Sequence, residues 1–270
     1  MPVLVTAAQH PLARRIATRL LEEGGEVRVT ADGDVSTLRA AGAFVATAAS
    51  DDEGRLEAAL ADAHTLVHVG GGIGTPDPAR VVADAEVVAR AAAGAGIRRL
   101  IALSLPGASP AATDPLRRAK GRMEEVFAGL TCPSIVLRCG LVDTPLLRDA
   151  LLTAGLPPEV MSTVVRPVRV DDLVELIVAF DRARSSRSEG HLVVAADGPL
   201  AMSLVAFVER VTPTNTGGRP SRIGRRLPDQ ATTARLTAVL AGPWSQEESY
   251  LLDGWGFAGL EPGVPGPLGS

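Results

Sequence analysis

Residues 3–29 read VLVTAAQHPLARRIATRLLEEGGEVRV, and this stretch decides the fold. Its apolar start, residues 3–6, predicts a buried strand. Residues 12–23 have the spacing of an amphipathic helix, which the pair Gly24-Gly25 ends. Residues 27–30 then predict a second strand. A strand, a helix and a strand in this order form a unit whose two strands lie parallel in one sheet.

The same alternation continues along the chain. We expect further strands at residues 43–46, 65–69, 100–104 and 134–138, and helices at residues 36–41, 51–61, 79–95 and 114–128. The apolar residues are mainly Ala, Val and Leu, as strands buried on both faces require. The sequence therefore predicts an α/β fold, a doubly wound parallel sheet of the Rossmann type.

The second half of the chain predicts a smaller lobe. We expect a helix at residues 171–182, a strand at 191–195 and a helix at 203–211, then a loop at 213–226 and helices containing residues 236–240 and 246–251. Residues 1–258 are thus predicted as one Rossmann-like domain, with the core at about 1–150 and a small substrate-side lobe at about 151–258. Residues 259–270, rich in Gly and Pro, are predicted as a flexible tail.

The composition of the chain argues against several classes of binding partner. The net charge of -4 comes without a basic stripe, so we expect no nucleic-acid binding. No run approaches the roughly 20 apolar residues of a membrane span, and we expect a cytoplasmic protein without a membrane partner. Cys132 and Cys139 lie at the two ends of the strand predicted at 134–138, whose extended backbone holds them too far apart for a disulfide. His64 and His68 lack the further ligands of a zinc site, so no metal is expected.

The turn after the first strand is where a Rossmann fold seats a dinucleotide pyrophosphate, using glycines and a helix N-terminus. Here the turn reads TAAQHPLA, residues 6–13. The stretch resembles the opening of the atypical and extended short-chain dehydrogenases of the NmrA-like group, which carry V-T-G-A-T-G-x-x-G. The resemblance covers roughly residues 3–211 and implies an NAD(P)-binding Rossmann fold. The three family glycines fall on Ala7, His10 and Ala13.

These replacements argue against ordinary cofactor binding. Ala7 is small, but His10 puts an imidazole where the family's backbone touches phosphate, so tight NAD(P) binding is not expected. A histidine at a helix N-terminus could still hydrogen-bond an anion, and His10 could equally be a surface turn residue. If a dinucleotide binds, Asp32 favours NAD over NADP, and Gly70 and Gly71 either approach the cofactor or only permit a tight turn.

The catalytic pair of the family is also incomplete. Short-chain dehydrogenases transfer a proton with a tyrosine whose pKa is lowered by a lysine four residues later. Lys120 matches that lysine, but Leu116 stands at the tyrosine position, and Tyr250, the chain's single tyrosine, lies outside the motif. The resemblance therefore does not imply a conventional Tyr-Lys dehydrogenase.

Four residues remain candidates for catalysis: Lys120, Ser104, His10 and Cys139. Ser104 matches one of two serines in the family's L-S-S-x-G-A motif. Cys139, at the carboxyl end of a predicted strand, is either a nucleophile or an inert packed thiol. Two further residues, Arg138 and Asp143, either orient a substrate or form structural ion pairs.

Three hypotheses follow for the function. The first is an enzyme that acts on a small organic metabolite by non-redox or unusual chemistry. The second is an NAD(P)-binding oxidoreductase or an NmrA-like redox-sensing regulator. The third is a non-catalytic interaction protein that forms a homodimer through apolar helices such as residues 79–95, although such helices also suit packing on a sheet.

Overall fold

The computed structural model describes residues 2–46, 52–73, 75–183, 190–211, 230–244 and 250–251. The loop expected at 213–226 and the tail expected at 259–270 lie outside these residues. Among the described residues, no helix combines the length and the apolar character that a membrane crossing needs.

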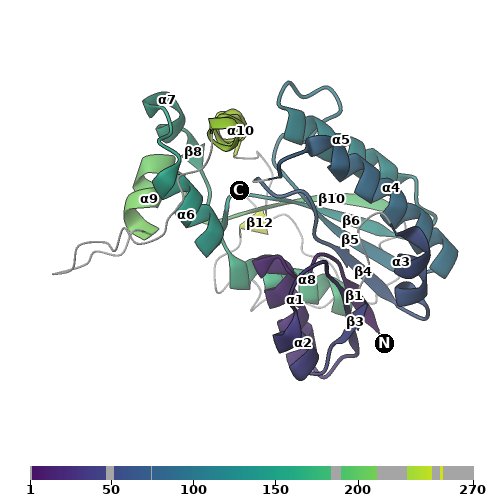
Figure 1. Ribbon diagram of the computed structural model, residues 1–270. Coiled ribbons are helices and arrows are strands. Elements are labelled where there is room, and N and C mark those ends of the chain that lie inside the picture. Colours follow the sequence, from purple (N-terminus) through teal and green to yellow (C-terminus); the bar gives the residue numbers. More distant parts are fainter. Residues whose placement is uncertain are drawn as a thin grey trace.

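Eight described strands form one parallel sheet, in the order β12-β10-β6-β5-β4-β1-β2-β3 (Figure 1). The sheet confirms the predicted doubly wound α/β fold. Its strand order reverses between β1 and β4, because the chain first builds outward to β3 and then returns to the other side of β1. The strands are β1 (Val3–Val5), β2 (Val27–Thr30), β3 (Phe44–Ala46), β4 (Thr65–His68), β5 (Arg99–Ser104), β6 (Ser134–Cys139), β10 (His191–Asp197) and β12 (Tyr250–Leu251).

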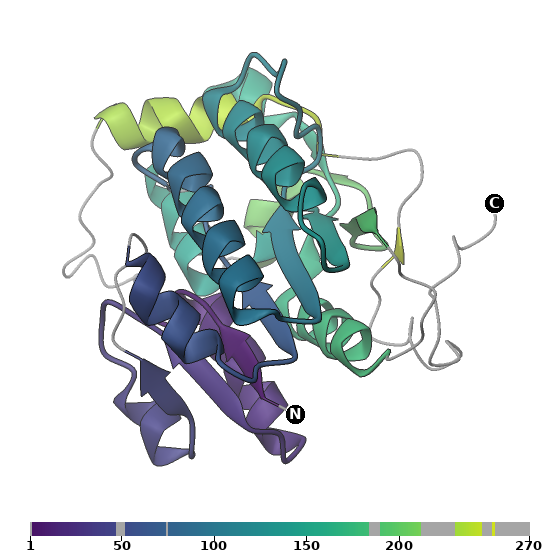
Figure 2. The ribbon, with the colours of Figure 1, turned by 90° about the vertical axis from the view of Figure 1, so that its right-hand side faces the viewer.

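Helices cover both faces of the sheet (Figures 1 and 2). One face carries α1 (Pro11–Glu22), α2 (Ser36–Ala40) and α8 (Val170–Arg182), and the other carries α3 (Glu53–Leu60), α4 (Pro78–Ala95) and α5 (Pro115–Ala128). Successive strand residues point to opposite faces, so Val3 and Val5 belong to the α1 core and Leu4 to the α4 core. This double burial explains why the strands read as continuous apolar runs.

A smaller group of elements lies beyond the carboxyl edge of the sheet (Figure 1). It contains α6 (Pro145–Thr153), α7 (Pro158–Met161), α9 (Leu204–Val211) and α10 (Gln230–Leu240). Strand β11 (Met202–Ser203) pairs antiparallel with β8 (Val164–Val165), and β7 (Val142–Asp143) pairs parallel with β9 (Val168–Arg169). The division of the chain into a core and a substrate-side lobe stays a prediction.

Three predicted elements differ from the structure in their type or in their position. The strand at 191–195 and the helix at 171–182 are predicted in the smaller lobe, whereas β10 pairs with β6 in the main sheet and α8 packs beside α1. The helix predicted over 246–251 is also wrong at its end, because Tyr250–Leu251 pairs with the open edge of β10. In each case the free edge or face of the sheet offers partners that local spacing does not reveal.

Candidate ligand-binding cleft

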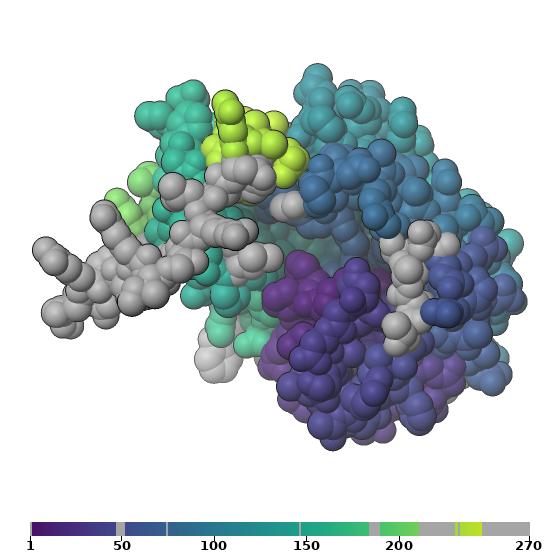
Figure 3. Space-filling view, viewed as in Figure 1, coloured from purple at the N-terminus to yellow at the C-terminus, as the bar shows by residue number. Residues whose placement is uncertain are grey.

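A cleft of about 880 Å³ opens at the carboxyl edge of the sheet. The turns that follow β1, β4, β5 and β6 form its floor, and α6 and α10 contribute to its outer wall. Figure 3 shows the hollow between the purple N-terminal part, the blue α4 region and the teal and yellow-green outer elements. The lining is mostly apolar and includes Val81, Leu103, Leu105, Val142, Leu147 and Leu236. This position is where open α/β folds bind their ligands.

The β1–α1 turn keeps the backbone of a glycine-rich loop without its glycines. Ala7 has a φ of 56°, in the left-handed region that glycine adopts without cost. For an alanine this conformation costs roughly 1–2 kcal/mol. The neighbouring Ala8 is fully buried, and its N–H donates to the Thr30 carbonyl at 2.9 Å. The loop shape at the head of α1 is therefore retained.

His10 caps helix α1 with its own imidazole. Its Nδ1 accepts a hydrogen bond from the Leu12 N–H at 3.3 Å, and Pro11, the first helical residue, has no N–H to offer. Burial lowers the pKa of His10, which favours the neutral ring that such an acceptor requires. A Cβ on Gly72 would lie 3.9 Å from the imidazole Nε2. The ring thus stands between the helix N-terminus and the glycine loop after β4.

This arrangement does not fit a dinucleotide in the family's usual pose. A pyrophosphate at a helix N-terminus needs free backbone N–H groups and room for the phosphate oxygens. Here the Leu12 N–H is already bonded to the imidazole of His10, which lines the cleft at this turn. The residues therefore do not offer the diphosphate seat that the resemblance implies.

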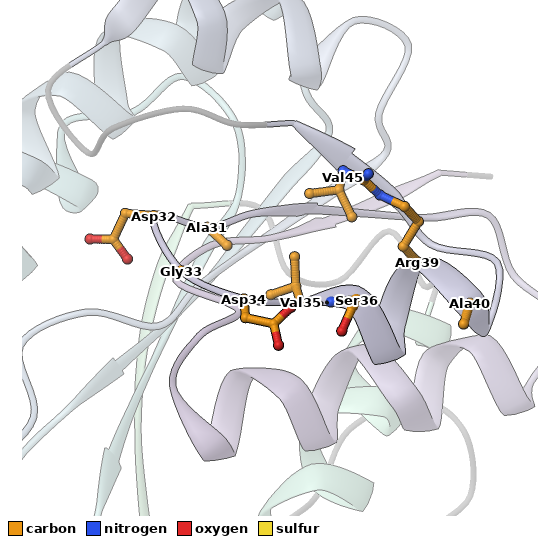
Figure 4. Close-up of a pocket in the computed structure, with 9 residues that line it drawn as sticks. All are labelled: Ala31, Asp32, Gly33, Asp34, Val35, Ser36, Arg39, Ala40 and Val45. Atoms are coloured by element: carbon orange, nitrogen blue, oxygen red, sulfur yellow. Dashed lines mark hydrogen bonds between the residues drawn. The ribbon is translucent and has the colours of Figure 1, made fainter.

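Asp32 follows β2 and borders both the cleft and a second cavity of about 460 Å³. Figure 4 shows the Asp32 carboxylate pointing away from Asp34 and Arg39. The backbone N–H of Ser36 donates to Asp34 at 2.9 Å, and this bond lowers the pKa of the Asp34 carboxyl. Two carboxylates at the end of β2 disfavour a phosphate group there. The preference for NAD over NADP stays a prediction.

The glycines after β4 are required by packing. Gly71 has a φ of +65°, and a Cβ there would lie 2.6 Å from Val81 Cγ2. A Cβ on Gly70 would lie 2.8 Å from His68 Nε2. Both glycines also line the cleft, so the tight turn is present and closeness to a bound ligand is compatible with it. Gly74, the last glycine of the run, lies outside the described residues.

Lys120 lies at the floor of the cleft and is only 2% exposed. Its Nζ donates to the Gly70 carbonyl at 2.5 Å and to the Leu103 carbonyl at 2.7 Å, and Met123 Sδ lies at 3.8 Å. Burial lowers the pKa of Lys120 to about 8, although Cys139 and Glu124 act in the opposite direction. Leu116, at the family's tyrosine position, is buried in the apolar core between α4 and α5 and brings no proton donor.

Ser104 and Arg138 belong to a partly buried ion-pair network. The Ser104 hydroxyl donates to Glu124 Oε1 at 2.5 Å, and Arg138 contacts both Glu124 oxygens at 3.0 and 2.6 Å. The Arg138 guanidinium also donates to the Ala108 carbonyl at 2.9 Å. The structural ion pair, one of the two interpretations of Arg138, is therefore present. Sequence reasoning missed Glu124, which was detectable only as a carboxylate four residues after Lys120 on the same helix.

Asp143 is likewise engaged in an ion pair. Arg148 donates to its two carboxylate oxygens at 2.5 and 2.6 Å, one helical turn into α6. Neither oxygen appears in the lining of the cleft, which passes through the flanking residues Val142 and Thr144. A substrate-orienting role for Asp143 or Arg138 stays a prediction.

Cys139 ends β6 and lines the cleft as a buried thiol. Its Sγ lies 3.4 Å from the Leu137 carbonyl. Burial raises the pKa of Cys139 to about 12, Asp197 raises it further, and Lys120 acts in the opposite direction. Because the thiolate is the reactive form, this environment favours the packed-thiol interpretation over the nucleophile.

His68, which in the sequence is only part of an incomplete zinc site, lines the cleft. Its Nδ1 lies 3.2 Å from Thr6 Oγ1, which also accepts the Val69 N–H at 3.0 Å. Burial lowers the pKa of His68 to about 3, so the ring is neutral. Within the described ranges, no group of three or more His, Cys, Asp or Glu residues could hold a metal ion.

Comparisons with known proteins find structural similarity only. No protein-family model matches the chain. No curated protein matches it in a sequence search. A UDP-glucose 4-epimerase from Thermotoga maritima, solved with UDP-glucose, is 17% identical with a TM-score of 0.64, over 89% of this chain and 98% of that one.

Two further solved structures are comparably similar. MoeE5, solved with UDP-glucose and NAD, is 18% identical with a TM-score of 0.62, over 78% of this chain and 82% of that one. The Bordetella bronchiseptica enzyme WbmG, solved with NAD, is 22% identical with a TM-score of 0.62, over 77% and 76%. At these identities the comparison establishes the fold alone. The chain thus shares the fold of these three solved structures.

Proposed function

We propose that this protein binds a small, largely apolar organic molecule in the cleft and acts on it by chemistry that does not use the Tyr-Lys pair. The observation that carries the proposal is the imidazole of His10, bonded to the Leu12 N–H where the family seats a diphosphate. The lining of about 880 Å³ is mainly apolar, and Lys120 supplies the polar group at its floor. Such a combination suits an apolar ligand with one hydrogen-bond acceptor.

The interaction-protein hypothesis is the weaker one. A vestigial cleft has no reason to stay open, and side chains that had lost a ligand would be expected to fill it. Instead the cleft is roomy, and both His10 and Lys120 line it. This observation supports a ligand-binding role over a purely structural one.

The nucleotide hypothesis is retained as a second candidate because of one observation. Asp32 lines a cavity of about 460 Å³ that adjoins the main cleft, at the end of β2 where the ribose of a dinucleotide would lie. MoeE5 is solved with UDP-glucose and NAD, and WbmG is solved with NAD. An NmrA-like regulator that binds NAD in an altered pose would use this side of the cleft.

A cleft-filling variant tests the leading proposal, with 2-nonanone as the apolar probe. Ala150 lies on α6 and lines the cleft, so Ala150→Trp should fill it and weaken binding by about tenfold or more, as the loss of a well-packed pocket costs at least about 1.4 kcal/mol. Ala93→Trp on the exposed side of α4 is the matched control. Calorimetry should give saturable binding to the unmodified chain and the control. Absence of saturable binding, or equal binding to Ala150→Trp, would overturn the proposal.

A further inference from the structure

We infer that the Lys120 amine captures the carbonyl group of an apolar aldehyde or ketone as an imine. The inference rests on the proposed function, since it names the chemical class of the ligand for the same cleft. It assigns Lys120 a covalent role, which is different from the role of the lysine in a Tyr-Lys pair.

Lys120 is the only lysine among the chain's 27 Lys and Arg residues. The other 26 cations are arginines, which stay protonated and do not form imines. The one side-chain amine of the chain is thus buried at the floor of the apolar cleft of about 880 Å³. An exposed lysine would be the ordinary position, because burying an ammonium is costly.

The contacts of Lys120 compensate a positive charge only weakly. Its Nζ donates to the carbonyls of Gly70 and Leu103, which are uncharged acceptors. Among the described residues, the third neighbour of Nζ is the thioether of Met123, a weak acceptor that compensates little charge. Because burial lowers the pKa of Lys120 to about 8, roughly half of the amine is unprotonated at that pH.

Lys120 lines the cleft beside the loop after β4, with 2% of its surface exposed. A Cβ on Gly71 would lie 3.4 Å from Lys120 Cε, so a side chain there would contact the lysine. Leu116 replaces the tyrosine that would otherwise share this helix face. Because no tyrosine stands at residue 116, the Lys120 amine has no phenol there whose pKa it could lower.

The chemical step needs no further reactant. The Lys120 nitrogen attacks the carbonyl carbon, a C–N bond forms, and a proton passes from nitrogen to oxygen to give a carbinolamine. Loss of the hydroxyl group with the second nitrogen proton releases one water and leaves the imine. The apolar walls favour this dehydration because they hold little water.

Reductive trapping tests the inference on the full chain. The protein is incubated with nonanal and cyanoborohydride, digested after arginine, and the alkylated peptides are quantified by mass spectrometry. The α-amino group of the protein sample is the internal reference amine. We expect Lys120 to be alkylated about tenfold faster than the reference amine, with a yield that rises with pH around a midpoint of about 8.

Two controls separate this inference from the proposed function. Lys120→Arg keeps a cation but cannot form an imine, so alkylation at residue 120 should disappear while the reference amine is still alkylated. An excess of 2-nonanol should slow trapping at Lys120 and leave the reference amine unaffected. Binding of 2-nonanone without trapping at Lys120 would overturn the inference and leave the proposed function standing. Failure of 2-nonanone to bind at all would overturn both.

Discussion

The burial of Lys120 in the cleft reduces the stability of the folded protein. Its pKa falls from 10.5 to about 8 on folding because burial disfavours the ammonium. A shift of this size corresponds to a cost of roughly 3 kcal/mol at neutral pH. A buried residue that destabilises the fold by this amount is typical of functional sites, where pKa values are shifted for a purpose.

The cost of Lys120 should appear as a pH dependence. Its pKa is lower in the folded protein than in the unfolded chain, so the unfolded chain binds more protons between about pH 8 and 10.5. Stability from this residue therefore rises with pH through that window. Relative to Lys120→Met, the unmodified chain should gain about 2 kcal/mol between pH 7.5 and 9.5, measured by urea unfolding. A constant difference between the two proteins would contradict the shifted pKa.

Helix α5 carries most of the site and is held close to the loop after β5. Gly121 is the contact point, because a Cβ there would lie 2.2 Å from the Ser109 carbonyl carbon and 2.4 Å from the Pro110 nitrogen. Both are backbone atoms, which cannot move aside as the end of a flexible side chain can. The position of Lys120, one residue earlier on α5, depends on this close approach.

Substitution of this glycine should loosen the helix. Gly121→Ala forces α5 away from residues 109–110, and we expect it to destabilise the protein by about 3 kcal/mol, the range of overpacked buried sites. The matched control is Gly54→Ala in α3, where a Cβ would meet nothing within 4 Å and alanine should stabilise the helix by up to about 1 kcal/mol. Thermal unfolding of the two variants measures the difference. Equal melting temperatures would show that α5 does not need the contact.

The spacing of apolar residues predicts most strands of the main sheet, but it misses the short strands near the outer wall of the cleft. The strands found at residues 3–5, 65–68 and 99–104 are long apolar runs between turn residues, which local sequence reveals. Strands β7, β8, β9 and β11 contain two residues each, too few for any period to appear. Strand β12 depends on pairing with β10, more than 50 residues earlier in the chain, and no local signal encodes such a contact.

The candidate site divides in the same way. Lys120, Ser104, Cys139 and His10 are identified by their places next to strand ends and in a family motif, and all four line the cleft. What sequence cannot supply is their partners. Glu124 accepts a hydrogen bond from Ser104 and forms an ion pair with Arg138, and two backbone carbonyls accept hydrogen bonds from Lys120. These contacts can be read only from the folded structure.

The cleft is built from segments that lie far apart in the sequence. Arg117 is 2% exposed and donates to the carbonyls of Pro106, Val239 and Pro243. Its guanidinium also lies 5.2 Å from the ring centre of the buried Trp244. These contacts fix the end of α10 against α5, and α10 in turn presents Leu236 to the cleft. The cleft therefore forms only when these distant segments pack together in the folded chain.

The central claim is that the imidazole of His10 has taken the place of a dinucleotide diphosphate. Titration of NAD into the unmodified chain and into His10→Gly, followed by calorimetry, tests it most directly, with circular dichroism to verify that the variant is folded. We predict no saturable binding to the unmodified chain up to about 1 mM and at least about tenfold tighter binding to His10→Gly. Micromolar binding of NAD to the unmodified chain, unchanged or weakened in His10→Gly, would contradict the claim.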